Sequence, residues 1–256
     1  MAVFFHRAIN FGRPLIYLLL LCGIGAGSAS AQRLYSVSVE SVTVHDGKKT
    51  VLNKDIFYRR DGNLNIRYAP AGAREYYSTT STFGFTTVYY PTTNESVTLA
   101  PEMFAADDEL LYLFATGGGE DLGMGRFGFV PKSTKKDGDF TVRRYEPREK
   151  AGTCAWVELV YGKDWLPVYC AYYDKKGKVI TKTYLSDYTS QKGFFFPRRV
   201  TEVTFFMEKN DSTVRRDIYR SLKLDEPDEM FDFHIPSGAK PVDLQEGLKS
   251  LSKSVR

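Results

Sequence analysis

The sequence predicts a mainly β protein with few helices, built on a single curved antiparallel sheet. Apolar and polar residues alternate with the period of two that is typical of strands, Asp-Gly pairs separate neighbouring runs, and one segment alone has convincing helical spacing. With 21 Gly, 11 Pro and 3 Cys, the chain is neither a collagen, nor a disordered tail, nor a disulfide knot. A sheet this large must twist, so its concave apolar face is either filled by protein or kept as a ligand cavity.

The first 31 residues have the pattern of a secretory signal peptide. Arg7 and Arg13 form a basic start, Leu15 to Ile24 is an apolar run, and the small residues 29–31 offer a cleavage site. The apolar run is shorter than the about 20 residues needed to span a bilayer, which disfavours the alternative of an uncleaved signal anchor. We therefore expect residues 1–31 to be a cleaved leader, and the protein to be periplasmic.

Charge and cysteine content describe the rest of the chain. Cys22 lies in the leader behind Leu21, where a lipoprotein signal requires a small residue, so we expect no lipidation there.

Two of the 35 basic residues leave with the leader and none of the 31 acidic residues does, so the remainder is nearly neutral and nucleic acid is not expected as a partner. Cys154 and Cys170 remain, and in an oxidising compartment this pair predicts one disulfide, with two free buried thiols as the alternative.

The first strands are read from alternation and turns. Tyr35, Val37 and Val39 alternate with polar residues. At Ser41 the apolar residues change from odd to even positions, which predicts a β-bulge there. An Asp-Gly pair at 46–47 predicts a tight hairpin turn. The next predicted strands end at residue 60, cover 64–68 and cover 83–90.

The predicted helix covers residues 102–116. Pro101 suits its beginning, Leu110, Leu111 and Phe114 share one face, and the glycines at 117–119 end it. The following residues, 120–138, are rich in glycine and lysine and are expected to form a long loop with a short strand at 127–130.

The second half is predicted to be a β-meander in the same domain. The sequence has no linker with a composition shift, so we expect one domain over residues 32–243 and a basic amphipathic tail over 244–256. The expected strands of this half are 139–145, 154–161, 167–174, 178–185, 199–208, 213–224 and 230–235.

The residue types do not predict catalysis. His45 and His234 have no zinc-site spacing, there is no nucleophile elbow, and the glycines at 117–119 lack the lysine and hydroxyl residue of a phosphate loop. The acidic groups at 107–109 and 225–229 are expected to be solvated. We expect no enzyme activity, no cofactor and no metal.

Arginine doublets place one arginine on each face of a strand, because neighbouring residues point to opposite sides. Arg60 shares a side with Ile56 and Tyr58. If those two line an apolar cavity, Arg60 either points inward, which is costly without a partner, or lies at the rim with its head in water. Both alternatives remain open at this point.

Several segments resemble, in order, the LolA-like carriers of outer-membrane lipoproteins. Residues 56–68 resemble the aromatic-basic strand, turn and return strand of that superfamily, and 88–91 resemble its aromatic strand ending in Tyr-Pro. Residues 174–178 are similar to its Asp-x-x-Gly turn, 196–200 to a segment of its lipoprotein-sorting branch, and 231–239 to its closing Phe-x-Phe-x-x-Pro-x-Gly motif.

The resemblance implies an unclosed half-barrel whose concave apolar face is covered by a helical lid and binds acyl chains. The family has an arginine at the end of the aromatic-basic strand that holds the lid closed, and Arg60 is the matching residue. The chain departs from the family in three places. Strand pattern follows Gln32 directly instead of an amphipathic helix, residues 81–84 replace an Asp-Gly turn, and the two cysteines are not part of the motif.

We therefore expect a periplasmic carrier in outer-membrane biogenesis that binds lipoprotein acyl chains or other lipid, without catalysis. The alternative is an envelope protein-interaction or sensing module on the same fold. Expected partners are lipid, an inner-membrane donor and an outer-membrane acceptor protein, and we expect a monomer. The expected acyl-binding residues are Ile56, Tyr58, Leu64, Ile66, Phe85, Leu110, Leu111, Phe114 and Trp156.

Overall fold

A computed structural model describes residues 33–60, 62–99, 104, 106–149, 152–206 and 211–243. The leader, Cys22 and the tail at 244–256 lie outside these residues. In the described residues, no helix has both the length and the apolar character needed to cross a membrane.

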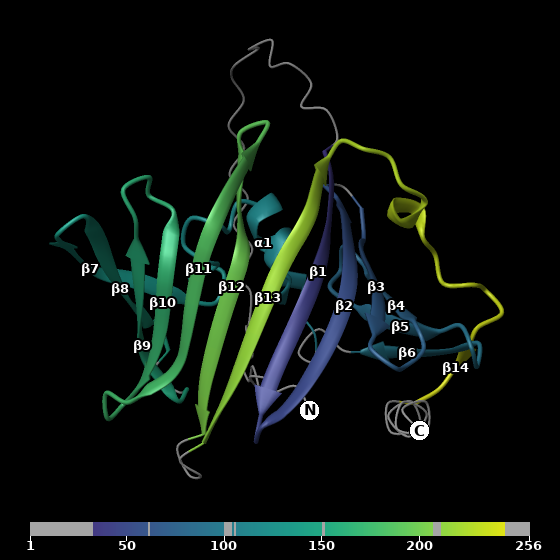
Figure 1. The fold of residues 1–256 in the computed structure, drawn as a ribbon, viewed down its shortest axis with the longest axis horizontal. Helices are drawn as coiled ribbons and strands as arrows, with labels where there is room; N and C mark the ends of the chain where they lie inside the picture. The colour runs from purple at the N-terminus through teal and green to yellow at the C-terminus, as the bar shows by residue number, and fades with distance from the viewer. Residues whose placement is uncertain are drawn as a thin grey trace, which may run out of the picture.

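The described residues form one large curved sheet that does not close on itself (Figure 1). Its strand order is β14-β6-β5-β4-β3-β2-β1-β13-β12-β11-β10-β9-β8-β7, so β14 and β7 are its two edges. Neighbouring strands are antiparallel, except that β14 lies parallel to β6. The predicted mainly β class and single unclosed antiparallel sheet are therefore confirmed.

The strands of the first half are β1 Leu34–His45, β2 Lys48–Arg59, β3 Leu64–Pro70, β4 Tyr76–Thr80, β5 Thr86–Tyr90 and β6 Glu95–Leu99. Those of the second half are β7 Phe129–Asp137, β8 Phe140–Pro147, β9 Cys154–Tyr161, β10 Pro167–Asp174, β11 Val179–Gln191, β12 Phe194–Phe206, β13 Asp211–Leu224 and β14 Lys240–Pro241. The helical elements are the 3₁₀ turns η1 Ala106–Asp108 and η2 Glu229–Asp232 and the α-helix α1 Leu110–Ala115.

The β1–β2 hairpin forms where the Asp-Gly pair predicts it. Asp46 and Gly47 have φ angles of 48° and 69°, and the strands pair without interruption from Leu34↔Arg59 to His45↔Lys48. Positive φ at both central residues is what a type I′ turn requires. The predicted bulge at Ser41 is wrong, because the irregularity of β1 lies against β13, between Ser36 and Ser38.

The apolar parity changes at Ser41 because the concave face itself changes character. Tyr35, Val37 and Val39 are buried in the main apolar cluster, whereas Ser41 faces the same side and donates a hydrogen bond of 2.6 Å to Asp217. Past this point the inner side is polar, so apolar residues no longer follow it.

The predicted helix over 102–116 is shorter in the structure, where α1 covers only Leu110–Ala115. Glu109 interrupts it with an extended backbone, at φ −90° and ψ 117°. The glycines after α1 end it as predicted, since Gly117 has a φ of 83° and the Gly118 N–H donates to the Leu113 carbonyl at 2.8 Å.

Three further predictions of element type are corrected. The loop expected over 120–138 ends in β7, an exposed, lysine-rich edge strand whose sides both face solvent, so it has no apolar alternation. Three short strands, β4, β6 and β14, were not predicted. The strand expected at 230–235 is instead the turn η2, which buries Phe231 against Phe57 with ring centroids 5.6 Å apart.

Candidate functional site

The candidate site is the apolar part of the concave face, where four predicted residues meet across two strands. Ile56 pairs directly with Ile66, and Tyr58 with Leu64. All four are buried in the main apolar cluster. Direct cross-strand partners place their side chains on one face, so β2 and β3 present a continuous apolar surface.

Helix α1 packs against this surface. It contacts β1, β2 and β12, and it lies behind the central strands in Figure 1. Leu111 is completely buried, and Leu110 and Phe114 are partly buried against the same cluster. Tyr112 of α1 meets Tyr58 edge to face, with ring centroids 4.8 Å apart. Seven of the nine residues predicted to bind acyl chains are thus brought together.

An ion pair anchors the beginning of α1. The Lys54 ammonium donates to both carboxylate oxygens of Glu109, each at 2.7 Å. The two side chains are only 15% and 8% exposed, so this pair is largely removed from water. Since Glu109 makes no capping hydrogen bond to the helix, its carboxylate is committed to the sheet.

A second contact holds both ends of the same segment. The Arg126 guanidinium donates to Asp107, before α1, at 2.8 Å, and to the Thr116 hydroxyl, after α1, at 2.7 Å. It also donates to the Thr116 carbonyl. One arginine therefore joins the beginning and the end of a six-residue helix.

Arg60 lies directly after β2, at the rim of the cluster, and is exposed. Its carbonyl accepts a hydrogen bond of 3.2 Å from the Tyr58 hydroxyl. Burial, followed by the neighbouring Tyr112 and Tyr35, raises the pKa of Tyr58 to about 12, and the positive charge of Arg60 opposes that shift. The rim position is the one found.

Two predicted residues lie away from the cluster. The Phe85 side chain is 52% exposed, before β5. Trp156 alternates with the buried residues Val157 and Leu159, so it faces the other side of the sheet. There it stacks on Tyr173 with ring centroids 5.0 Å apart, and the Arg144 guanidinium lies 4.5 Å from its ring. The sequence could not assign these faces because the neighbouring strands were unknown.

The expected disulfide is not formed, and Cys154 and Cys170 are free thiols. Cys170 pairs with Leu159, five residues along β9 from Cys154, which places the cysteines about 15 Å apart along the strand. A disulfide requires Cα atoms closer than about 7 Å. The two cysteines, which the even count predicted to form a disulfide, are therefore kept apart by the register of β9 and β10.

We expect the chain from residue 32 onward to release two alkylatable thiols on denaturation without reductant, and almost none when folded. Burial raises the pKa of both thiols, to about 12 for Cys170, which keeps them protonated and unreactive. Intact-mass spectrometry after iodoacetamide in guanidinium measures the number. A denatured chain that takes up no label would contradict the free thiols, and Cys170→Ala, which leaves one thiol, is the control.

The histidines form no convincing metal centre among the described residues. His45 lies near Asp46 and Asp211, and all three are exposed or half-buried. Its Nε2 is 3.5 Å from Asp46 and its Nδ1 is 3.6 Å from Asp211, so the two carboxylates approach different ring nitrogens. One ligand atom from each residue lies within 4.8 Å of the other two, but exposed acidic groups of this kind are common without a bound ion.

Three solved structures are similar to this arrangement of sheet and helix. A LolA superfamily protein from Nitrosomonas europaea aligns with a TM-score of 0.55 and 17% identity, over 78% of this chain and 90% of that chain. A DUF1329 family protein from Desulfovibrio piger has a TM-score of 0.54 and 13% identity, over 80% and 91%. A putative outer membrane lipoprotein-sorting protein domain from Vibrio parahaemolyticus has a TM-score of 0.50 and 10% identity, over 78% and 89%. This protein has the LolA-like fold.

The LolA-like fold confirms the family resemblance of the sequence at the level of architecture. By sequence alone, no protein-family model and no curated protein matches the chain. Strand β1 of this LolA-like sheet begins at Leu34, close to Gln32, after which the sequence has a strand pattern.

Sequence reasoning missed the polar anchors of the LolA-like site. Lys54 shares the parity of Ile56 and Tyr58, so alternation could have placed it on the concave face. Glu109 was expected to be solvated, and its partner lies 55 residues away, which no local pattern indicates. Arg126 lies in a segment that was read only as a loop.

Proposed function

We propose that the protein is a periplasmic, non-catalytic carrier that binds the acyl chains of lipoproteins or other lipids against the concave face of the sheet. Residues 1–31 direct it to the periplasm, residues 32–243 form the carrier, and residues 244–256 are a basic tail. An inner-membrane donor and an outer-membrane acceptor protein exchange the lipid with it. The shared LolA-like fold and the predominantly apolar concave cluster support this function.

The observation that carries the proposal is how the apolar face is covered. A helix of six residues buries Leu111 and is anchored by side chains at its two ends. A helix this short is not stable in isolation, so its order depends on the sheet beneath it. The segment from η1 to α1 can therefore act as a lid that leaves the face as one unit.

An acyl chain is a suitable replacement for the lid. It would cover the surface that Leu110, Leu111 and Phe114 cover when the lid is closed. For the acyl chain and for the lid alike, the favourable free energy of burial is about 25 cal/mol per Å² of apolar area removed from water. Because the two burial terms nearly cancel, binding stays moderate and the lipid can be handed on. In this proposal Arg60 keeps the latch role that the resemblance implies, and Lys54 and Arg126 share it.

The direct test is lipid content. Protein purified from the periplasm is extracted and analysed by mass spectrometry, and the delipidated protein is titrated with a fluorescent fatty acid. The carrier function predicts a co-purifying acyl species and saturable binding. If neither is observed, the carrier function is rejected, and a protein partner captured without lipid then favours an interaction module.

We expect Lys54→Gln to raise the rate of fluorescent fatty acid uptake about tenfold. Removing the ammonium leaves the Glu109 carboxylate in the closed lid without its cation, a loss of about 1–3 kcal/mol that the open state does not suffer. Stopped-flow fluorescence measures the uptake rate.

Three variants complete this test. The exposed Lys49→Gln on the same strand should leave uptake unchanged. Lys54→Gln combined with Glu109→Gln should return uptake toward the original rate, because the unpaired carboxylate is removed. Arg60→Leu should also raise uptake, and unchanged uptake and release in that variant would remove Arg60 from the latch.

A further inference from the structure

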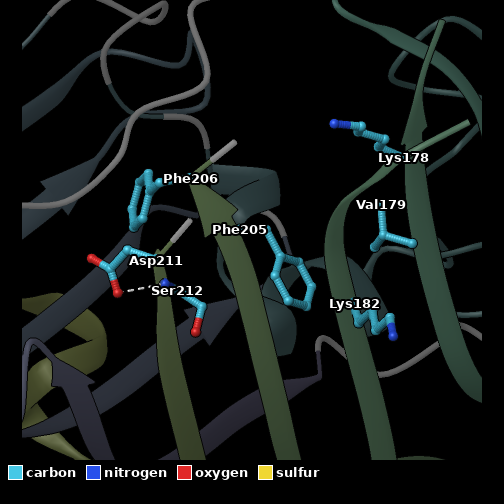
Figure 2. Close-up of a pocket in the computed structure, with 7 residues that line it drawn as sticks. All are labelled: Lys178, Val179, Lys182, Phe205, Phe206, Asp211 and Ser212. Atoms are coloured by element: carbon cyan, nitrogen blue, oxygen red, sulfur yellow. Dashed lines mark hydrogen bonds between the residues drawn. The ribbon is translucent and has the colours of Figure 1, made fainter. Parts of the chain in front are cut away.

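An opening lies at the end of the sheet opposite Arg60, between β11 and β12 (Figure 2). Its volume is about 560 Å³, within the range of about 300–1,000 Å³ that small-molecule sites occupy. It is distinct from the candidate site, because Arg60 follows the last residue of β2 whereas the opening adjoins Asp211, the first residue of β13.

The opening exists because two neighbouring strands part. Pairing of β11 with β12 runs from Gln191↔Phe194 to Thr181↔Thr204 and stops there. Beyond that point β11 stays with β10 through Tyr173↔Val179, while β12 stays with β13 through Phe206↔Asp211. The two hairpins therefore diverge and leave a gap bordered by side chains from both.

The gap combines an apolar floor with two cations. Figure 2 shows the Phe205 ring turned toward Lys182 and Val179, and the ammonium of Lys182 lies 5.7 Å from the centre of that ring. Strand alternation puts Lys182 and Phe205 on the face away from α1, since their neighbours Thr181 and Thr204 face the concave side. Lys178 borders the same gap and is exposed.

The charges of the opening favour an anion. Among the described residues, neither Lys178 nor Lys182 forms an ion pair. Of the described residues that line the opening, Asp211 has the one carboxylate, and it accepts a hydrogen bond of 2.6 Å from the Ser212 N–H and lies 3.6 Å from His45. Two ammonium groups without an ion-pair partner in the described part of the chain thus lie beside aromatic and aliphatic side chains.

We propose that this opening is a second ligand site, which binds a single anionic amphiphile. A carboxylate or phosphate lies between Lys178 and Lys182, and an apolar chain lies against Phe205. Lys182 and Phe205 lie on the side of the sheet away from α1, and the opening is at the end opposite Arg60, so it can be occupied whether or not the apolar cluster under α1 holds a lipid.

Nuclear magnetic resonance separates the two sites on the intact protein. Dodecanoate and dihexanoylphosphatidylglycerol are the probes, each used below its micellar concentration, and dodecyltrimethylammonium is the cationic control of equal chain length. We expect both anionic probes, or one of them, to shift the amide signals of Val179, Lys182 and Ser212, and the control not to do so. The probe that binds identifies the anion as carboxylate or phosphate.

The lysines are tested with a matched pair of double variants. Lys178→Gln with Lys182→Gln should weaken binding of the anionic probe about three- to tenfold, because each exposed ion pair contributes modestly. Lys132→Gln with Lys135→Gln, on the exposed edge strand β7, should leave it unchanged. Raising the salt concentration should weaken binding to the unaltered protein as well.

Three outcomes would overturn the second site. The affinity could be the same in the Lys178/Lys182 variant, or the cationic amphiphile could bind as well as the anionic one. Probe-induced shifts could also be confined to the methyl groups of Ile56 and Ile66, which would support the carrier function alone. Shifts confined to the residues of the opening would support the second site and count against the concave one.

Discussion

Phe196→Ala is expected to lower the free energy of unfolding by about 3–5 kcal/mol. Phe196 has no exposed surface and lies among aromatic rings from three elements. Its centroid is 5.1 Å from that of Tyr219, 5.5 Å from Phe114 of α1 and 5.9 Å from Phe194. Removing it opens a cavity between the sheet and the helix, and it also removes edge-to-face contacts that contribute beyond burial.

Urea unfolding followed by circular dichroism measures this loss, with an unchanged m-value showing that the transition remains comparable. Phe195→Ala is the matched control, because Phe195 is the next residue of β12 and is 49% exposed. We expect the control to stay within about 0.5 kcal/mol of the original protein. Equal effects of the two substitutions would contradict the assignment of Phe196 to the core beneath α1.

Stability is expected to fall steeply between pH 9 and pH 12. Burial raises the pKa of the Cys170 thiol from 9.0 to about 12, and burial beside Tyr112 and Tyr35 raises the pKa of Tyr58 from 10.0 to about 12. Above pH 9 for the thiol and above pH 10 for the tyrosine, the unfolded chain loses the proton while the folded protein keeps it. The unfolded state then binds fewer protons, so the free energy of unfolding decreases with rising pH.

Each group that is protonated only in the folded state lowers stability by about 1 kcal/mol per pH unit. For Cys170 the loss begins near pH 9 and is complete near pH 12, and for Tyr58 it begins near pH 10. Urea midpoints at half-unit steps from pH 8 to pH 11 measure the slope. Cys170→Ala should reduce the slope between pH 9 and pH 10, where the raised pKa of Cys154 still contributes, and a flat profile of the unaltered protein to pH 10.5 would contradict the buried thiols.

Strand positions in the middle of the sheet were predictable because their signal is local. The alternation in Ile56, Tyr58, Leu64 and Ile66 and the turn at Asp46 need only neighbouring residues, and the structure bears both out. Strands that are short or exposed on both sides were not predictable in this way. Strand β7 is exposed on both sides, and β4 and β6 are too short to show a clear period.

The candidate site likewise has a part that local alternation predicts and a part that depends on contacts between distant residues. Alternation placed four residues on one face correctly, but it could not state that Lys54 would meet Glu109 or that Phe196 would meet Phe114. Those contacts join residues far apart in sequence, and they depend on how strongly the sheet curves toward α1.

The sequence by itself determined the class of this protein, the β1–β2 hairpin and the side on which the apolar residues of β2 and β3 lie, because the period of two and the φ angles of turn residues are local properties of the chain. Tertiary structure alone decided the rest. Register separated Cys154 from Cys170 and brought Ser41 within 2.6 Å of Asp217, 176 positions along the chain. Register and curvature arise from the whole sheet at once, so no single segment carries them.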